Sequence, residues 1–431
     1  DKRKARKNNG AKRDMHYEME QEEHDVYPDD PDFDINKARL VTTAPRICVR
    51  YECVPMRFIK HVYKIHTYAQ DGRLFEGKTP VSAFLNSSYD GSFIAGLMEL
   101  RYIQSLPVER IINYFESHGF TLKKPTAHKL MEKASSLFEN LYKCIRQTAL
   151  SDPYKAADET YYKILVPEKN SKGKGVRKGY LWVVVGINTR MIYLLYDDGS
   201  RSEKVILNEL GGCKGIIQSD GYSPYRKLES DAYPHITRIP CLQHIKRKFI
   251  DCGEDDPDAK RIVEMINTLY QNEHKHKIGV DGWTVEQNLV HRKKYAPDIL
   301  GEIKDVLDDI EERGDLLPKS ELKEAITYLR NEWNAVVDIF NYGDTYLDNN
   351  IVERMNRYIS LSRKNSLFFG SHKGAERGAI LYTIALTCRM NKVNLFEYLT
   401  DVINRTAEWQ PNTPLEKYRQ LLPDRWEKAN D

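Results

Sequence analysis

The chain has 431 residues, of which 41% are hydrophobic and 30% are charged, so it can bury a sizeable core beneath a well-solvated surface. No apolar run approaches the roughly 20 residues that a membrane helix needs. The seven cysteines are scattered and odd in number, which argues against a disulfide framework and for a reducing compartment. We therefore exclude membrane, disulfide-stabilised secreted and disordered classes, and expect a cytoplasmic protein of about three domains with no membrane partner.

The net charge of +3 conceals strong segregation of charge along the chain. Residues 1–13 carry seven Lys or Arg and one Asp, whereas residues 14–34 carry ten acidic residues and no Lys or Arg. Such like-charge blocks predict a disordered tail over residues 1–34, although the basic arm could also contact phosphates. Residues 351–392 carry eight basic and two acidic residues interleaved with aromatic ones, which is typical of a folded surface that receives a polyanion.

Residues 35–80 predict a small β-rich subdomain, because Ile47–Cys53 and Arg57–Tyr68 are rich in strand-forming residues. Cys48 and Cys53 also lie in this region. A structural zinc site takes four ligands and no second pair is near, so we interpret these two as core cysteines.

Residues 81–150 are helical in pattern and are a candidate DNA-binding region. Pro107 suits the first position of a helix that ends at Gly119, and Pro125 opens a second helix with Lys124 and Lys129 on it. Two helices joined by a Gly-containing turn have the helix-turn-helix layout. Two packed helices without any DNA role would show the same pattern.

Residues 151–251 predict the first part of an α/β core with a mixed sheet. The expected elements run in the order β-β-β-α-β-α-β, which is the ribonuclease-H-like topology without its last helix; they are Glu159–Val166, Tyr180–Ile187, Met191–Tyr196, Ser202–Leu210, Gly215–Ser219, His235–Ile239 and Cys241–Asp251. Residues 252–340 are charged, helical and poor in strand formers, so we interpret them as an inserted helical block. Residues 341–405 would supply the rest of the core and two C-terminal helices, and residues 406–431 a tail.

Three carboxylates separated by 62 and 133 positions could meet in such a core. Asp158 begins the first expected strand and Asp220 ends the fourth, and these two strands are neighbours in a ribonuclease-H-like sheet. Glu353 lies on the polar face of a helix that Asp348 or the following asparagines can cap. Mg²⁺ prefers such oxygen ligands, and two ions about 3.5–4 Å apart can drive an in-line phosphoryl transfer.

The residues around these carboxylates carry a family resemblance. The resembling stretches are Ala157-Asp158-Glu159-Thr160, Asp220-Gly221-Tyr222-Ser223-Pro224-Tyr225, Cys241–Phe249, Leu347–Arg354 and Arg363–Ser371, and the last two form the most specific block. On these residues the chain resembles transposases of the insertion sequence 66 family, which are bacterial DDE transposases. The looser similarity extends from about residue 40 to 405.

The resemblance implies a Mg²⁺-dependent enzyme that cuts the ends of an insertion sequence and joins them to target DNA. Asp158, Asp220 and Glu353 would be the catalytic residues and the ligands of two Mg²⁺ ions, with Mn²⁺ as a substitute. The partners implied are the terminal inverted repeats, target DNA, a second copy of the chain in synapsis and small accessory proteins of the same element.

Basic residues near the expected site are candidates for binding DNA phosphates. They are Arg354, Arg357, Arg363, Lys364, Lys373, Lys246, Arg247 and Lys248, with Lys124 and Lys129 in the helix-turn-helix candidate. Each also has an ordinary interpretation: Arg357 can pair with Glu353 four residues earlier, and the cations of residues 246–248 can lie on a solvated helix face.

The sequence departs from the family at the zinc-binding segment that members commonly carry near the N-terminus, because only two cysteines lie there. We therefore do not expect a zinc site in that region. Cys241 and His244 match the family block, but two ligands do not make a zinc site and a packing role at a helix start fits equally well.

Two alternative functions remain open from the sequence. The chain could be an inactive DNA-binding regulator that uses only its basic regions, or another ribonuclease-H-like nuclease that acts on RNA–DNA hybrids or junctions.

Overall fold

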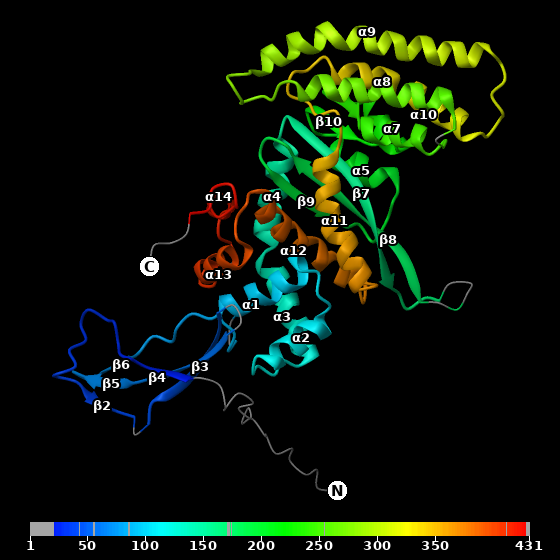
Figure 1. Ribbon diagram of the computed structural model, residues 1–431. Helices are drawn as coiled ribbons and strands as arrows, with labels where there is room; N and C mark the ends of the chain where they lie inside the picture. Colours follow the sequence, from blue (N-terminus) through cyan, green and yellow to red (C-terminus); the bar gives the residue numbers. More distant parts are fainter. Residues whose placement is uncertain are drawn as a thin grey trace. The chain divides into compact units, whose positions relative to one another are not determined.

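The structure is a computed structural model that describes residues 21–427, apart from residues 43, 55–56, 85–86, 170–172, 174, 254 and 411. The chain divides into two compact units (Figure 1). One contains the described residues up to Leu141, Lys364–Ser366 and those from Ile380 onward; the other contains Tyr142–Arg363 and Leu367–Ala379. Over the described ranges, no helix combines the length and the hydropathy needed to cross a membrane.

The first unit begins with two small sheets. One has the order β1-β4-β3 and the other β2-β5-β6; the strands are β1 (Gln21–Val26), β2 (Arg39–Leu40), β3 (Arg46–Val54), β4 (Arg57–Ile65), β5 (Thr67–Gln70) and β6 (Arg73–Glu76). The central strand β4 is mostly buried, whereas the edge strand β1 is mostly exposed. Strands β2–β6 lie within residues 35–80, the range expected to be β-rich.

The expectation of a disordered tail over residues 1–34 is wrong for its last part. Strand β1 pairs in parallel with β4, from Gln21 opposite Lys60 to Val26 opposite Ile65. Strand β1 carries part of the acidic block, and its Glu23 forms an ion pair with Lys64 of β4. Cross-strand pairing of opposite charges favours this order over a solvated acidic run. Residues 1–20 of the predicted tail lie outside the described residues.

The helices of the first unit pack around an aromatic cluster. Phe58 of β4 lies 4.9 Å from both Phe115 and Phe120, measured between ring centroids, and Phe93 lies 4.9 Å from Phe120. The helical elements are α1 (Gly91–Met98), the π-helical turn η1 (Glu99–Ile103), α2 (Val108–Ser117), α3 (Lys124–Leu137), α13 (Leu395–Thr406) and α14 (Leu415–Gln420). The helices α4 (Glu139–Ser151) and α12 (His372–Met390) each contribute to both units.

The segment predicted as a tail after residue 405 is instead folded. Helix α14 buries Tyr418, and the buried Leu422 follows it. Tyr398 of α13 donates its hydroxyl to the Leu421 carbonyl at 2.8 Å, and the Trp426 indole N–H donates to Asp401 at 2.6 Å. Apolar residues spaced four apart give α14 a buried face, which the charged composition of the segment conceals.

The second unit is built on a five-stranded mixed sheet of order β11-β10-β7-β8-β9. β7–β8 and β8–β9 are antiparallel, whereas β10 pairs in parallel with both β7 and β11. The strands are β7 (Tyr154–Leu165), β8 (Val176–Gly186), β9 (Met191–Leu195), β10 (Gly215–Ser219) and β11 (Ile236–Pro240). The predicted neighbourhood of the first and fourth strands is confirmed, and the unit is a mixed α/β structure.

Strand β7 starts earlier than the sequence pattern predicts. It begins at Tyr154 rather than at Glu159, so Asp158 lies inside the strand and not at its start. Residues 154–157 are buried without alternation because β10 and β8 cover this stretch from both edges. A buried run of this kind has no period-two signal, which explains the difference.

Short helices follow the sheet strands, and three long helices form the predicted inserted block. Figure 1 shows α8, α9 and α10 side by side next to α7. The elements are α5 (Glu203–Leu210), α6 (Ser223–Arg226), the 3₁₀ turn η2 (Lys227–Glu229), α7 (Leu242–Ile250), α8 (Pro257–His274), α9 (Val285–Glu312) and α10 (Glu321–Ile339). The apolar faces of α7, α8, α9 and α10 share one core with Tyr154, Ile216 and Ile239 of the sheet, so the helical block is packed on the sheet.

Two buried arginines fix this block to its surroundings. Arg238 of β11 contacts Glu332 of α10 at 2.5 Å, and the two side chains are 0% and 1% exposed. Arg238 also donates to the Asp220 carbonyl at 2.7 Å. Arg292 of α9 donates to Glu273 of α8 at 2.7 Å and to the Thr345 carbonyl at 2.6 Å, which holds the loop that leads to the next helix. A buried charge without its partner is costly, so these contacts determine the packing.

We predict that Glu332→Gln lowers the free energy of unfolding by about 3 kcal/mol, because it leaves the buried Arg238 without its full counter-charge. The matched control is Glu324→Gln at an exposed position of α10, which should change the free energy by less than about 0.5 kcal/mol. Urea unfolding followed by circular dichroism measures both. Equal stability of the two variants would contradict the role assigned to this ion pair.

Candidate active site

Asp158 lies in the middle of the sheet, on β7, with its side chain half-buried. One carboxylate oxygen, Oδ2, accepts a hydrogen bond of 2.7 Å from the Asn356 side-chain amide. The other accepts from the Glu159 backbone N–H at 2.8 Å. The carboxylate is therefore held in place from two directions, one of them a helix far downstream in the sequence.

Asp220 follows β10 directly and is level with Asp158. The parallel register pairs Gln218 with Ala156, so two residues further along each strand the two aspartates come opposite each other. The Asp220 carboxylate accepts from the Tyr222 backbone N–H at 3.1 Å. The chain turns sharply at Gly221, where a Cβ would lie 2.5 Å from the Tyr328 hydroxyl oxygen, so only glycine fits between β10 and α10.

Burial and neighbouring carboxylates raise the pKa of Asp158 and of Glu159. Burial, with the neighbouring carboxylates of Glu159 and Asp220, raises the pKa of Asp158 to about 8. Burial also raises the pKa of Glu159, although Arg201 contacts this carboxylate at 2.5 Å and opposes the shift. Arg201 favours the ionised form of Glu159, and a cation bound at the two aspartates would favour their ionised forms in the same way.

Glu353 is on α11 (Asn350–Asn365), a helix tied along β7 at a spacing of seven residues. The Asn349 side chain donates to the Ala157 carbonyl at 3.0 Å, Asn356 donates to Asp158, and Arg363 donates to the Tyr161 carbonyl at 2.6 Å. Seven residues are close to two helical turns, so these three side chains share one face of the helix. Docking of this face places Glu353 one turn before Asn356.

The Glu353 carboxylate itself faces α7. Its Oε1 lies 3.7 Å from His244 Nε2, and its Oε2 lies 4.0 Å from the Arg247 guanidinium. The Cys241 sulfur, the His244 ring and the Glu353 carboxylate form a group whose ligand atoms all lie within 4.8 Å of one another. Glu353 Oε1 and His244 Nδ1 are buried without a hydrogen-bond partner, and burial raises the pKa of the Cys241 thiol to about 12.

The structure thus places two of the three predicted carboxylates opposite each other on neighbouring strands, and the third one helical turn away from Asn356, which contacts Asp158. In the described part of the chain, Asp158, Asp220 and Glu353 do not together form a group whose ligand atoms all lie within 4.8 Å of one another. Sequence reasoning missed Asn356 and Asn349, which tie α11 to β7. The repeat of Asn349, Asn356 and Arg363 at seven-residue intervals was the available signal.

The basic residues predicted to bind DNA occupy different environments. Arg354, Arg357 and Lys373 are exposed in the second unit, whereas Arg363 packs on the Tyr161 ring at 4.0 Å. Arg247 faces Glu353, and Lys246 and Lys248 lie over aromatic rings at 6.0 and 5.9 Å. In the first unit, Lys364 and Lys129 are exposed and Lys124 is paired with Glu109 at 2.5 Å.

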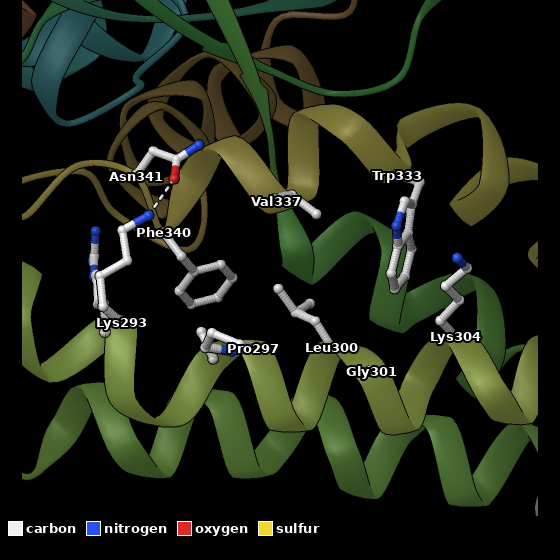
Figure 2. A pocket seen from close by; sticks show the side chains of 11 residues that line it. Lys293, Pro297, Leu300, Gly301, Lys304, Trp333, Val337, Phe340 and Asn341 are labelled. Atoms are coloured by element: carbon white, nitrogen blue, oxygen red, sulfur yellow. Dashed lines mark hydrogen bonds between the residues drawn. The ribbon is translucent and has the colours of Figure 1, made fainter.

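A separate pocket lies between α9 and α10, and none of the predicted site residues lines it. Figure 2 shows Pro297, Leu300, Val337 and Phe340 along it, with Trp333 at one end. Its volume is about 260 Å³. None of its lining residues is acidic, so the pocket offers no carboxylate for a metal-dependent phosphoryl transfer.

Comparisons with known proteins identify the family of the chain. A family model described as "Transposase IS66 family" matches residues 86–377. Two curated relatives from Sinorhizobium fredii (strain NBRC 101917 / NGR234) are both described as uncharacterized proteins. The protein y4jD is 26% identical over 77% of this chain and 65% of its own length, and y4hP is 24% identical over 92% of this chain and 76% of its own length. The chain therefore spans slightly less than two-thirds of y4jD.

We predict that Asn356→Ala lowers the free energy of unfolding by about 1–3 kcal/mol, because the buried Asp158 carboxylate loses its donor from α11. Arg354→Ala, at an exposed position of the same helix, is the matched control and should change it by less than about 0.5 kcal/mol. Chemical denaturation at pH 7 compares the two. If Asn356→Ala were as stable as the control, the docking of α11 on β7 would need another explanation.

Proposed function

The chain belongs to the IS66 family of transposases, and on that premise we propose that it cleaves the ends of an insertion sequence and transfers the 3′-hydroxyl ends into target DNA. The observation that carries the proposal is that Asp158 on β7 lies opposite Asp220 at the end of the parallel strand β10, with the Glu353-bearing helix docked on β7. Such a site is suited to holding divalent cations against a phosphodiester.

The order of the sheet supports a ribonuclease-H-like core. An antiparallel meander, β7–β8–β9, is followed by two parallel strands added on the other side of β7. This order puts the first and fourth strands side by side, so that Asp158 inside β7 lies opposite Asp220, which follows β10. We propose that α11 is the last helix of this core and that residues 252–340 are an insertion before it.

The donor atoms of the site fit Mg²⁺, with Mn²⁺ as a substitute, because Mg²⁺ binds carboxylate oxygens and keeps water in its remaining positions. Asp158, Asp220 and Glu353 would hold two ions. When bound, they would activate the attacking hydroxyl and neutralise the leaving oxygen of an in-line phosphoryl transfer. The unpartnered Oε1 of Glu353 supports this assignment, since a buried carboxylate oxygen needs a partner that the described side chains do not supply.

Other residues of the chain would position the site rather than react. Asn356 holds Asp158, and Arg238 holds the Asp220 backbone through its carbonyl. A rotation of the Glu353 side chain would break its contact with His244 and allow the carboxylate to bind the metal. In the structure His244 and Arg247 hold this carboxylate against α7.

Phosphate contacts would come from the exposed cations around α11. Arg354 and Arg357 follow Glu353 by one and four residues, so they lie beside the proposed metal site. The other predicted DNA-binding residues are Arg363, Lys364, Lys373, Lys246, Arg247 and Lys248, and Lys124 and Lys129 on the α2–α3 pair, which we propose as a helix-turn-helix. Synapsis of two ends would require a homodimer, and accessory proteins of the element would be further partners.

We predict that Asp158→Asn, Asp220→Asn and Glu353→Gln each lower cleavage and strand transfer by about a thousandfold, because each removes a ligand of the metal ions that stabilise the transition state. The assay uses a duplex carrying the element's terminal inverted repeat with Mg²⁺ or Mn²⁺. DNA binding by gel shift should stay within a few-fold of wild type.

The matched control for this series is Asp198→Asn, since this carboxylate is 87% exposed and belongs to the same unit. It should cleave like wild type. Full activity of Asp220→Asn would contradict the proposal, and so would cleavage of an RNA–DNA hybrid in preference to the terminal repeat. Equal binding without any cleavage by wild type would favour an inactive regulator.

We predict that the double substitution Arg354→Ala/Arg357→Ala makes DNA binding less dependent on salt. Each phosphate contact releases counterions from the DNA when it forms, so a variant with fewer contacts releases fewer of them. The slope of log K against log salt should become shallower by about two. Lys294→Ala/Lys304→Ala, two exposed positions of α9, is the charge-matched control. An equal change of slope in both pairs would show that total charge, and not the α11 surface, governs binding.

A further inference from the structure

The first unit contains a second cluster of metal-binding side chains, on the sheet formed by β1, β4 and β3. Strand β1 pairs with β4 so that Glu22 is opposite His61, and His24 lies two residues after Glu22 on the same face of the strand. His24 Nε2 is 3.1 Å from His61 Nδ1. Glu22 Oε2 is 3.7 Å from the first of these nitrogens and 3.8 Å from the second. The three atoms therefore form a nearly equilateral triangle.

The second nitrogen of His61 is already engaged by a carboxylate. His61 Nε2 is 2.7 Å from Glu52 Oε2 on β3, and the His61 side chain is only 12% exposed. A hydrogen bond donated from Nε2–H to a carboxylate leaves Nδ1 with its lone pair free, and it fixes the orientation of the ring. The His24 ring stacks on Tyr63 at 5.2 Å, which restrains the other imidazole.

We propose that Glu22, His24 and His61 bind a transition-metal ion of the Zn²⁺ class, with Glu52 as the residue that orients His61. Two imidazoles and one carboxylate are a common ligand set for zinc with an open fourth position. With bonds of about 2.0–2.1 Å, ligand atoms around a tetrahedral ion lie roughly 3.3–3.5 Å apart, close to the three distances here. Nitrogen ligands make the site unsuited to Mg²⁺.

Exposure of the cluster leaves room for a water molecule as fourth ligand, because the Glu22 and His24 side chains are 48% and 43% exposed. The ion would join β1 to β4 through their side chains. Strand β1 is an edge strand of six residues that pairs with β4, so this link would stabilise it strongly for its size. The site is separate from the proposed DNA-cleaving residues, which belong to the other unit.

The experiment measures binding of Co²⁺ and Zn²⁺ to the full chain after removal of metal with a chelator. All variants carry His244→Gln, so that the Cys241–His244–Glu353 group cannot contribute a second site. In this background we expect one Co²⁺ with the visible absorption of a tetrahedral complex, displaced by Zn²⁺. Isothermal titration calorimetry gives the affinity.

His24→Gln and Glu22→Gln should each weaken binding at least tenfold, and Glu52→Gln about 10–100-fold, as expected for a residue that orients a ligand. His235→Gln, an exposed histidine of the other unit, is the control and should bind like the background. Binding should also raise the melting temperature of the background but not that of His24→Gln.

Unchanged affinity in both His24→Gln and Glu22→Gln would overturn the proposal, as would the absence of any Co²⁺ complex in the background chain. In either case His24, His61 and Glu52 would form only a hydrogen-bonded network. Because the readout is metal binding at the first unit, its failure leaves the proposed DNA cleavage untouched.

Discussion

The parallel pairing of β7 with β10 is the constraint on which the rest of the second unit depends. It sets Asp158 and Asp220 opposite each other, and two carboxylates at one buried edge repel. The repulsion costs free energy, which the sheet and the surrounding hydrogen bonds must offset. Strain of this electrostatic kind is typical of functional sites, because it is relieved when a cation binds.

Several contacts serve to hold these two strands and their carboxylates in place. Asn349, Asn356 and Arg363 attach α11 along β7, and each contacts a different residue of the strand. Arg238 connects β11, the Asp220 carbonyl and Glu332 of α10. The helical block α8–α10 contacts the same region, since the Tyr328 hydroxyl of α10 accepts a hydrogen bond from the Gly221 backbone N–H. Its packing on the sheet gives this block a structural role.

The two three-residue groups of metal-binding side chains differ in chemistry. Cys241, His244 and Glu353 form the first group, in which Glu353 Oε1 and His244 Nδ1 are buried without a hydrogen-bond partner. Glu22, His24 and His61 lie on a small sheet, where a second carboxylate, Glu52, contacts His61. The first group offers one sulfur, one nitrogen and one oxygen and the second offers two nitrogens and one oxygen, so both suit a metal of the zinc class better than Mg²⁺.

The sequence by itself determined the local elements and the family. Strand and helix periods located the five strands of the mixed sheet, the three helices of residues 252–340 and the helix that carries Glu353, because burial on one face imposes a period on the residues themselves. Charge composition was misleading at residues 21–26 and after residue 405, since it does not show that an acidic strand pairs with a cationic one or that a charged helix has one buried face.

Only the tertiary structure decided which side chains meet. The Asn356–Asp158 contact joins residues 198 positions apart, and the Glu22–His24–His61 group depends on the register of β1 against β4. The tertiary structure also turned Glu353 toward His244 instead of the aspartates. Contacts of this kind depend on strand register, helix rotation and side-chain rotamers. Residue spacing along the chain does not give these distances, because packing sets them.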